Sequence, residues 1–349
     1  MEPLETIHIP SEKLHLFIKE VLLKAGVRED VARCVTEGLI QTSLRGVDSH
    51  GIRLLPHYVR ALKGGRINPH PHYAFQHTSP STGLFDGDHT FGHAAGMEAT
   101  KKAILLAKEA GSGHVAVYHS THFGAAAYYG LEIAKHDMIG FCFSNTDALI
   151  KSTGGKRPFF GNNPICITVP CKDEEPFCLD MATSHMTFNK VKQFGQEGKE
   201  LPEGIGFDQE GRETQNPEEV VMLAPIGGYK GYGLSMAIEI LCGLLTGMQY
   251  GRHIPKMFEA PLSQKRFLGH FIIALRINCF QAMDVFKERF SHMIQELRNE
   301  PCMDTSNPIQ MPGDPEKNIF RIRKKAGIPL SLEEYSVLQS IGQEYEIHI

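Results

Sequence analysis

A change in hydrophobic periodicity near residue 70 constrains the fold of this chain more than any other feature. Before it, apolar residues recur at helical spacing, which predicts helices over residues 11–26, 29–44 and 51–62. Pro69, Pro71 and Pro80 then predict an extended linker over residues 67–80, because proline fixes φ and lacks an N–H group. The linker separates a small helical bundle from a region of a different type.

Helix and strand patterns alternate after the linker. Helices are expected at residues 95–110, 125–136, 234–247 and 285–297, and strands at 114–118, 139–144, 165–169, 177–180 and 269–277. The apolar run at 234–247 is too short to span a bilayer, which takes about 20 residues, so it predicts a buried helix. The polar segment 300–317 carries four prolines and predicts an ordered loop or a linker.

These patterns predict an α+β fold in two domains. A helical domain is expected from residues 1–75 together with about 300–349, and a cofactor-binding α+β domain from residues 76–299. A glycine-rich GxGxxG turn between a strand and a helix is missing, since Gly111-Ser-Gly113 lies between a helix and a strand, the reverse of the Rossmann order. We therefore predict a non-Rossmann sheet-and-helix domain.

Composition excludes several classes of protein. The 36 basic and 40 acidic residues are well mixed and give a net charge of −4, so nucleic acid and anionic membranes are not expected partners. Eight cysteines without a CxxC pair favour reduced thiols over a disulfide frame or a zinc cage. Residues 1–5 show no start of a secretory signal. We expect a cytoplasmic protein.

One short segment, Gly46-Val-Asp-Ser-His-Gly-Ile-Arg53, places a carboxylate, a hydroxyl, an imidazole and a guanidinium within six residues. A guanidinium such as that of Arg53 can bind a carboxylate through two parallel hydrogen bonds, and His50 can give or take a proton near neutral pH. The alternative is structural, because Asp48 and Ser49 are also preferred N-cap residues for a following helix. Both interpretations stay open on this segment alone.

Small residues also cluster at three predicted turns, His122–Ala126, Asp180–Ser184 and Gly227–Gly233. Such turns let backbone N–H groups approach an anion, and Lys230 adds a charge suited to a phosphate. A metal site is not expected, because His119 and His122 are three residues apart and point to opposite faces of an extended segment. His122 is instead a second acid/base candidate.

Taken in order, these segments resemble the malate/L-lactate dehydrogenase family of the non-Rossmann type, which includes ureidoglycolate, sulfolactate and diketogulonate enzymes and an imino-acid reductase. The resemblance covers nearly the whole chain and rests on residues 48–53, 122–126, 161–164, 180–184, 230–234, 269–271, 312–316 and 327–329.

The resemblance implies a homodimer that binds NAD or NADP and a small 2-oxo or 2-hydroxy acid. It implies catalytic roles for Ser49, His50 and His122, and substrate contacts from Arg53, Asn162 and Lys190. The implied cofactor contacts are His122, Phe123, Gly124, Ala125, Ala126, Thr146, Asp180, Met181, Ala182, Lys230, Gly313, Asp314 and Glu316. Asn162 replaces the family's usual threonine and Asn189 its common glycine, so no relative's substrate can be transferred directly.

The implied activity is that of an NAD(P)-dependent 2-hydroxyacid dehydrogenase, in which a hydride passes between nicotinamide and C2 of the acid. An alternative within the family is reduction of a cyclic imine. A metal-dependent lyase or hydrolase built on His50, His114, His119 and His122, or a non-catalytic relative that kept only the pocket, are the alternatives from other classes.

Overall fold

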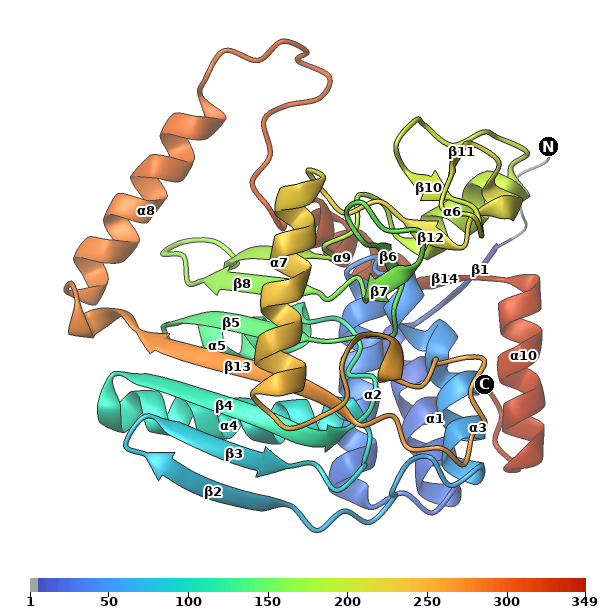
Figure 1. Cartoon of the computed structure of the whole chain (residues 1–349). Coiled ribbons are helices and arrows are strands. Elements are labelled where there is room, and N and C mark those ends of the chain that lie inside the picture. The colour runs from blue at the N-terminus through green and yellow to red at the C-terminus, as the bar shows by residue number, and fades with distance from the viewer. Residues whose placement is uncertain (1–5) are drawn as a thin grey trace.

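The computed structural model describes residues 6–349; residues 1–5, where we looked for a secretory signal, lie outside this range. Its helices and mixed sheets confirm the α+β fold class (Figure 1). The helices are α1 (Ser11–Lys24), α2 (Glu29–Leu44), α3 (Leu55–Lys63), α4 (Gly92–Ala110), α5 (Ala127–Ala134), α6 (Phe188–Gln196), α7 (Tyr229–Glu239), α8 (Met283–Arg298), α9 (Asp314–Ala326) and α10 (Leu332–Glu344). Within the described range, no helix is both long and apolar enough to cross a membrane.

A seven-stranded sheet forms the centre of the molecule, with strand order β2-β3-β4-β13-β5-β8-β9. Its strands are β2 (Ala74–Ser79), β3 (Thr82–Asp86), β4 (Ser112–Ser120), β5 (Met138–Ser144), β8 (Ile165–Val169), β9 (Phe177–Met181) and β13 (Leu268–Arg276). Only β3 and β4 pair in parallel; the other neighbours are antiparallel.

Both faces of this sheet are covered, as the alternation of side chains requires. Val115 and Val117 on β4 join the main core with α4 and α5, whereas Ala116 between them joins a smaller core on the opposite face with Ile238 of α7. Figure 1 shows α4 and α7 on the two sides of the sheet.

Two smaller sheets complete the fold. One has the order β11-β10-β12-β6-β7 and comprises β6 (Ile150–Lys151), β7 (Pro158–Phe160), β10 (Gly206–Phe207), β11 (Glu213–Thr214) and β12 (Met222–Leu223). In the other, β1 (Thr6–Ile9) pairs with β14 (Ile328–Ser331). This pairing joins the two ends of the chain, and α10 also contacts α1 and α3 while α9 contacts α2. The proposed division into two domains itself stays a prediction.

Several local expectations were wrong. Residues 74–79 of the predicted linker form strand β2, because prolines occur only outside that stretch. The predicted third helix is broken, since residues 48–50 and 52–54 are short 3-10 turns before α3 begins at Leu55. The helix over 234–247 is α7 followed by a π-helical segment, Ile240–Leu244, and it is only partly buried: Leu244 and Leu245 are 56% and 55% exposed.

Candidate active site

The described part of the chain surrounds a large, partly open cavity, with a volume of about 2390 Å³. The predicted site residues that line it are Ser49, His50, Arg53, His122, Phe123, Gly124, Ala125, Ala126, Thr146, Asn162, Asp180, Met181, Ala182, Lys190, Gly313 and Glu316. These residues span more than 260 positions of sequence, so folding brings them together. A cavity of this size exceeds the usual 300–1,000 Å³ of a small-molecule site and can hold two ligands.

His50 and His122 face each other across this cavity. Their ring centroids lie 5.5 Å apart and the rings are nearly parallel, with an interplanar angle of 28°. Ser49 Oγ lies 2.8 Å from His50 Nδ1, within the 3-10 turn at residues 48–50. Protein atoms crowd both rings although they open onto the cavity, and this desolvation lowers the pKa of each imidazole. The two candidate acid/base groups therefore lie together, and burial favours the neutral form of each.

Arg53 lines the same cavity as these histidines, and its guanidinium is held from one side. Nε of Arg53 lies 2.6 Å from Oε1 of Glu334 on α10, more than 280 residues later in the chain. Asp48 is not free to cap or to react, because Arg323 donates to both of its carboxylate oxygens and fixes the turn. Glu334 and Arg323 are partners that sequence patterns could not find, since both lie far away in the chain.

The turn from Phe123 to Ala126 forms a narrow wall before α5. A Cβ on Gly124, whose φ is +75°, would lie 2.5 Å from Nε2 of His93, so only glycine fits there. The carboxylate of Asp180 accepts a hydrogen bond of 2.8 Å from the N–H of Ala127 at the start of α5. Protein atoms surround this carboxyl although it opens onto the cavity, and the desolvation raises its pKa to about 6, against the weaker opposite effect of the Ala127 N–H.

Residues on the sheet side of the cavity hold one another in place. Oγ1 of Thr146 donates to Oδ1 of Asn162 over 3.0 Å, and the Thr146 N–H donates to Asn163. Ser235 bonds the carbonyl of Gly161 and so anchors this loop on α7. Lys190 lies on α6 at the cavity edge, where its ammonium contacts Gln193.

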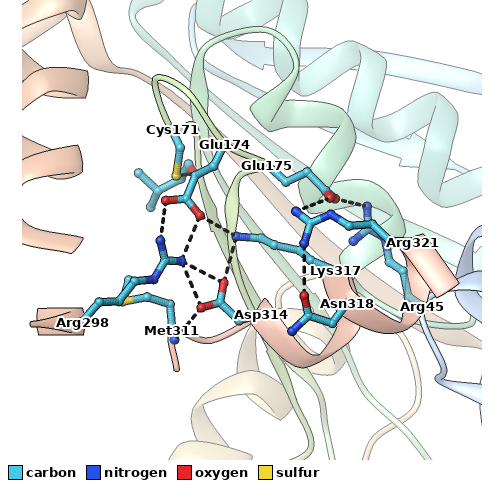
Figure 2. Close-up of polar contacts among 11 residues, drawn as sticks. Arg45, Cys171, Glu174, Glu175, Arg298, Met311, Asp314, Lys317, Asn318 and Arg321 are labelled. Atoms are coloured by element: carbon cyan, nitrogen blue, oxygen red, sulfur yellow. Dashed lines mark hydrogen bonds and ion pairs between the residues drawn. The ribbon is translucent and has the colours of Figure 1, made fainter. Parts of the chain in front are cut away.

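The last wall of the cavity follows the long loop after α8. Gly313 packs on the backbone of Cys178, whose N–H donates to the carbonyl of Pro312. Asp314, predicted to contact the cofactor, does not line the cavity: it accepts hydrogen bonds from Arg298 and Lys317 (Figure 2). Arg298 also donates to both carboxylate oxygens of Glu174. This cluster fixes the start of α9, so that Glu316 stays at the cavity.

Lys230 is the other predicted residue outside the cavity, exposed in the first turn of α7. The four histidines of the metal-enzyme alternative do not form one group: His50 stacks on His122, whereas His119 contacts Asp86 and His114 contacts Ser112. Among residues 6–349, no three His, Cys, Asp or Glu side chains are grouped so that they could hold a metal ion. The pattern at 114–122 therefore forms no such site in the described chain.

The walls fit an extended dinucleotide. Gly124 and Gly313, both at positive φ, line the cavity with backbone, and its volume of about 2390 Å³ leaves room for a substrate besides the cofactor. Tyr58 is buried behind the cavity lining, where its hydroxyl contacts His122, and the sequence patterns did not single it out. Its helical position was predicted, but nothing in the sequence showed that it contacts His122.

Comparison with known proteins agrees with this geometry. Residues 9–339 match the model of the malate/L-lactate dehydrogenase family. Malate dehydrogenase of Pyrococcus abyssi is 36% identical over 347 residues, which cover 97% of this chain and 94% of the relative. Malate/(S)-sulfolactate dehydrogenase of Methanothermus fervidus is 32% identical over 342 residues, with 97% and 98% covered.

Solved structures show the same relationship. The crystal structure of malate dehydrogenase from Entamoeba histolytica superposes with a TM-score of 0.93 at 31% identity and covers 99% of both chains. The resemblance inferred from the motifs is thus confirmed over almost the full length. The chain belongs to the malate/L-lactate dehydrogenase family and is a nicotinamide-dependent hydroxyacid oxidoreductase.

Proposed function

We propose that this enzyme interconverts a small 2-hydroxy acid and its 2-oxo acid, with NAD or NADP as the cofactor. The observation that carries the proposal is that His50, His122 and Arg53 line one cavity, with the two imidazole rings 5.5 Å apart. A carboxylate anchor next to two acid/base groups suits a substrate with a carbonyl adjacent to a carboxylate.

Arg53 is the proposed carboxylate anchor. Glu334 contacts Nε, which leaves the outer edge of the guanidinium, with both Nη atoms, for two parallel hydrogen bonds to the substrate. This side chain is 44% exposed, so the edge is open to a ligand. Glu334 thereby orients Arg53 rather than occupying the whole group.

His50 is the proposed proton donor to the substrate's carbonyl oxygen, with Ser49 bound to its other nitrogen. A bound nicotinamide supplies the hydride that the carbonyl carbon receives. The residues proposed to contact this cofactor are Phe123 to Ala126, Thr146, Asp180 to Ala182, Gly313 and Glu316, all on the cavity wall. Asn162 and Lys190 are proposed substrate contacts.

The enzyme is also proposed to be a homodimer. The helix α7 and its π-helical extension expose a set of large apolar side chains: Tyr229, Leu234, Met236, Ile240, Leu244 and Leu245. Such a patch marks an interaction surface in soluble proteins. Figure 1 shows that α8 and the loop after it project away from the rest of the molecule. An element in such a position is expected to pack on a second subunit. Lys230 is exposed in the first turn of the same helix, so we propose that its cofactor contact forms in the dimer.

All eight cysteines are free, which supports a reducing compartment such as the cytoplasm. The proposed function is tested with a panel of 2-oxo acids, namely oxaloacetate, pyruvate and sulfopyruvate, and a cyclic imino acid. Each is assayed with NADH and with NADPH by the loss of reduced-cofactor absorbance. Turnover of a 2-oxo acid supports the proposal; turnover of the imine alone, or of no compound although the reduced cofactor binds, contradicts it.

A further inference from the structure

The hydroxyl of Tyr58 is placed to control His122. Tyr58 is only 2% exposed, and its oxygen lies 2.7 Å from His122 Nδ1. Among residues 6–349, His122 is the one hydrogen-bond partner of this hydroxyl. The two rings are held in this arrangement by Phe91 and His93, which pack edge-on against the Tyr58 ring at centroid distances of 6.1 and 5.4 Å.

This geometry selects one tautomer of His122. If Nδ1 carried a proton, it would donate to the Tyr58 oxygen and the buried phenolic hydrogen would have no acceptor, which is unfavourable. If Tyr58 donates to an unprotonated Nδ1, both groups are satisfied and the proton of the neutral ring is on Nε2. Burial also raises the pKa of the Tyr58 hydroxyl, so it keeps the proton that it donates. His122 Nε2 is then a hydrogen-bond donor on the cavity side.

His50 is under no such constraint. Its Nδ1 partner is Ser49, a half-buried hydroxyl that can rotate and either donate or accept. His50 can therefore become an imidazolium by donating from Nδ1 to Ser49, while the Ser49 hydrogen turns toward the cavity. Protonation of His122 would leave the Tyr58 hydrogen without an acceptor.

We propose that Tyr58 is a positioning residue that holds His122 as the neutral Nε2–H tautomer, so that His122 donates a hydrogen bond to the substrate's carbonyl oxygen while His50 alone transfers the proton. This assignment rests on the proposed function. On reduction, the hydride adds to C2, the carbonyl π electrons move to oxygen, and that oxygen takes the Nε2 proton of the His50 imidazolium. His50 is left neutral, and the protonation state of His122 does not change.

The surroundings of His122 favour the same state. The groups that face His122 come from four segments. They are His50 in the 3-10 turn at residues 48–50, His57 and Tyr58 on α3, His93 on α4, and Arg266 just before β13. No carboxylate is among them to stabilise an imidazolium, and Arg266 opposes one. Desolvation, the largest effect, and these neighbours hold the pKa of His122 well below its usual value.

The direct test is ¹⁵N nuclear magnetic resonance of the full-length enzyme labelled at its histidines, without substrate. The His122 signals are assigned by their absence in His122→Gln. We expect a protonated Nε2 and an unprotonated Nδ1 from neutral pH down to the lowest pH at which the enzyme stays folded. A wild-type His122 with its proton on Nδ1, or one that titrates together with His50, would overturn the proposal. Because this readout needs no turnover, its failure is distinct from failure of the proposed function.

Tyr58→Phe then removes only the hydroxyl. We expect kcat to fall on the order of 10-fold with little change in KM, because an untethered His122 donates less well in the transition state. A second ionisation should appear in the acidic limb of the pH profile as His122 becomes able to protonate. Tyr73→Phe is the matched control, because it also removes a buried hydroxyl, one without a hydrogen-bond partner and away from the cavity. An unaltered tautomer and pH profile in Tyr58→Phe would refute the assigned role.

Discussion

Replacing Arg53 by lysine tests the carboxylate anchor most sharply. The Nε atom of Arg53 lies 2.6 Å from Oε1 of Glu334, and its Nη2 atom lies 3.9 Å from Oδ2 of Asp48, which is beyond hydrogen-bond distance. Both Nη groups are therefore available, and a carboxylate can accept one hydrogen bond from each. Lysine keeps the charge, but its single ammonium cannot reproduce the fork and would also be attracted to Glu334.

The expected loss follows from the hydrogen bonds. Arg53→Lys removes one charge-assisted bond to the substrate, which is worth about 1.5–3 kcal/mol. Since about 1.4 kcal/mol corresponds to a factor of 10, kcat/KM should fall roughly 10- to 100-fold. Affinity for NADH or NADPH should barely change, because the anchor contacts the substrate and not the cofactor in this account.

Steady-state kinetics and a cofactor fluorescence titration measure these two quantities. Arg212→Lys is the matched control, since Arg212 pairs with Asp208 and Glu210 on the surface and does not line the cavity. Near-normal kcat/KM in Arg53→Lys would remove Arg53 from the substrate site. An equal loss of cofactor affinity would mean that the substitution disturbs the whole cavity.

Three further predictions follow from other parts of the structure. Because the folded-state pKa of Asp180 is raised to about 6 from 3.8, ionisation costs stability above that pH and the cost disappears as pH falls toward 3.8. Asp180→Asn should thus raise the free energy of unfolding by about 1 kcal/mol at about pH 8, a value discounted for the exposure of Asp180 to the cavity. Near about pH 4.5 the increase should be much smaller. A difference between the two proteins in urea unfolding that does not change with pH would contradict this. Arg298→Met should weaken NAD(P)H binding several-fold, because it releases Asp314 at the start of α9. Arg289→Met, also on α8, should not. Equal cofactor titration curves for the two variants would exclude a role of Arg298 in cofactor binding. Leu244→Glu should shift sedimentation toward monomer, while Leu105→Glu, which is exposed to a similar degree on α4, should not; a wild-type monomer would remove the proposed interface.

Local structure was predictable where the determinants are local. The bounds of α1 and α2 follow from helical spacing and their end signals, and β5 and β8 from short apolar runs. The burial of the helix after residue 234 was mispredicted. An apolar sequence indicates that the helix is covered, but it does not indicate whether the covering surface belongs to the same chain. The pairing of β1 with β14 connects residues more than 300 positions apart, which no pattern in either segment encodes.

The same distinction applies to the site. Motif order brought Ser49, His50 and His122 together as candidates, and the structure places all three on one cavity. It did not reveal Glu334 beside Arg53, which depends on how α10 packs. Asp314 illustrates the converse case: its position in a motif suggested ligand contact, whereas the structure pairs it with Arg298 and Lys317.

Hydride transfer to C2 of a 2-oxo acid is the central claim, and isotope transfer measures it directly. The enzyme is supplied with the best substrate of the panel and with reduced cofactor carrying deuterium at the transferred position of C4. Mass spectrometry and proton resonance then locate the label in the product. We predict a 2-hydroxy acid that carries the deuterium on C2; a product without deuterium on that carbon would contradict the account.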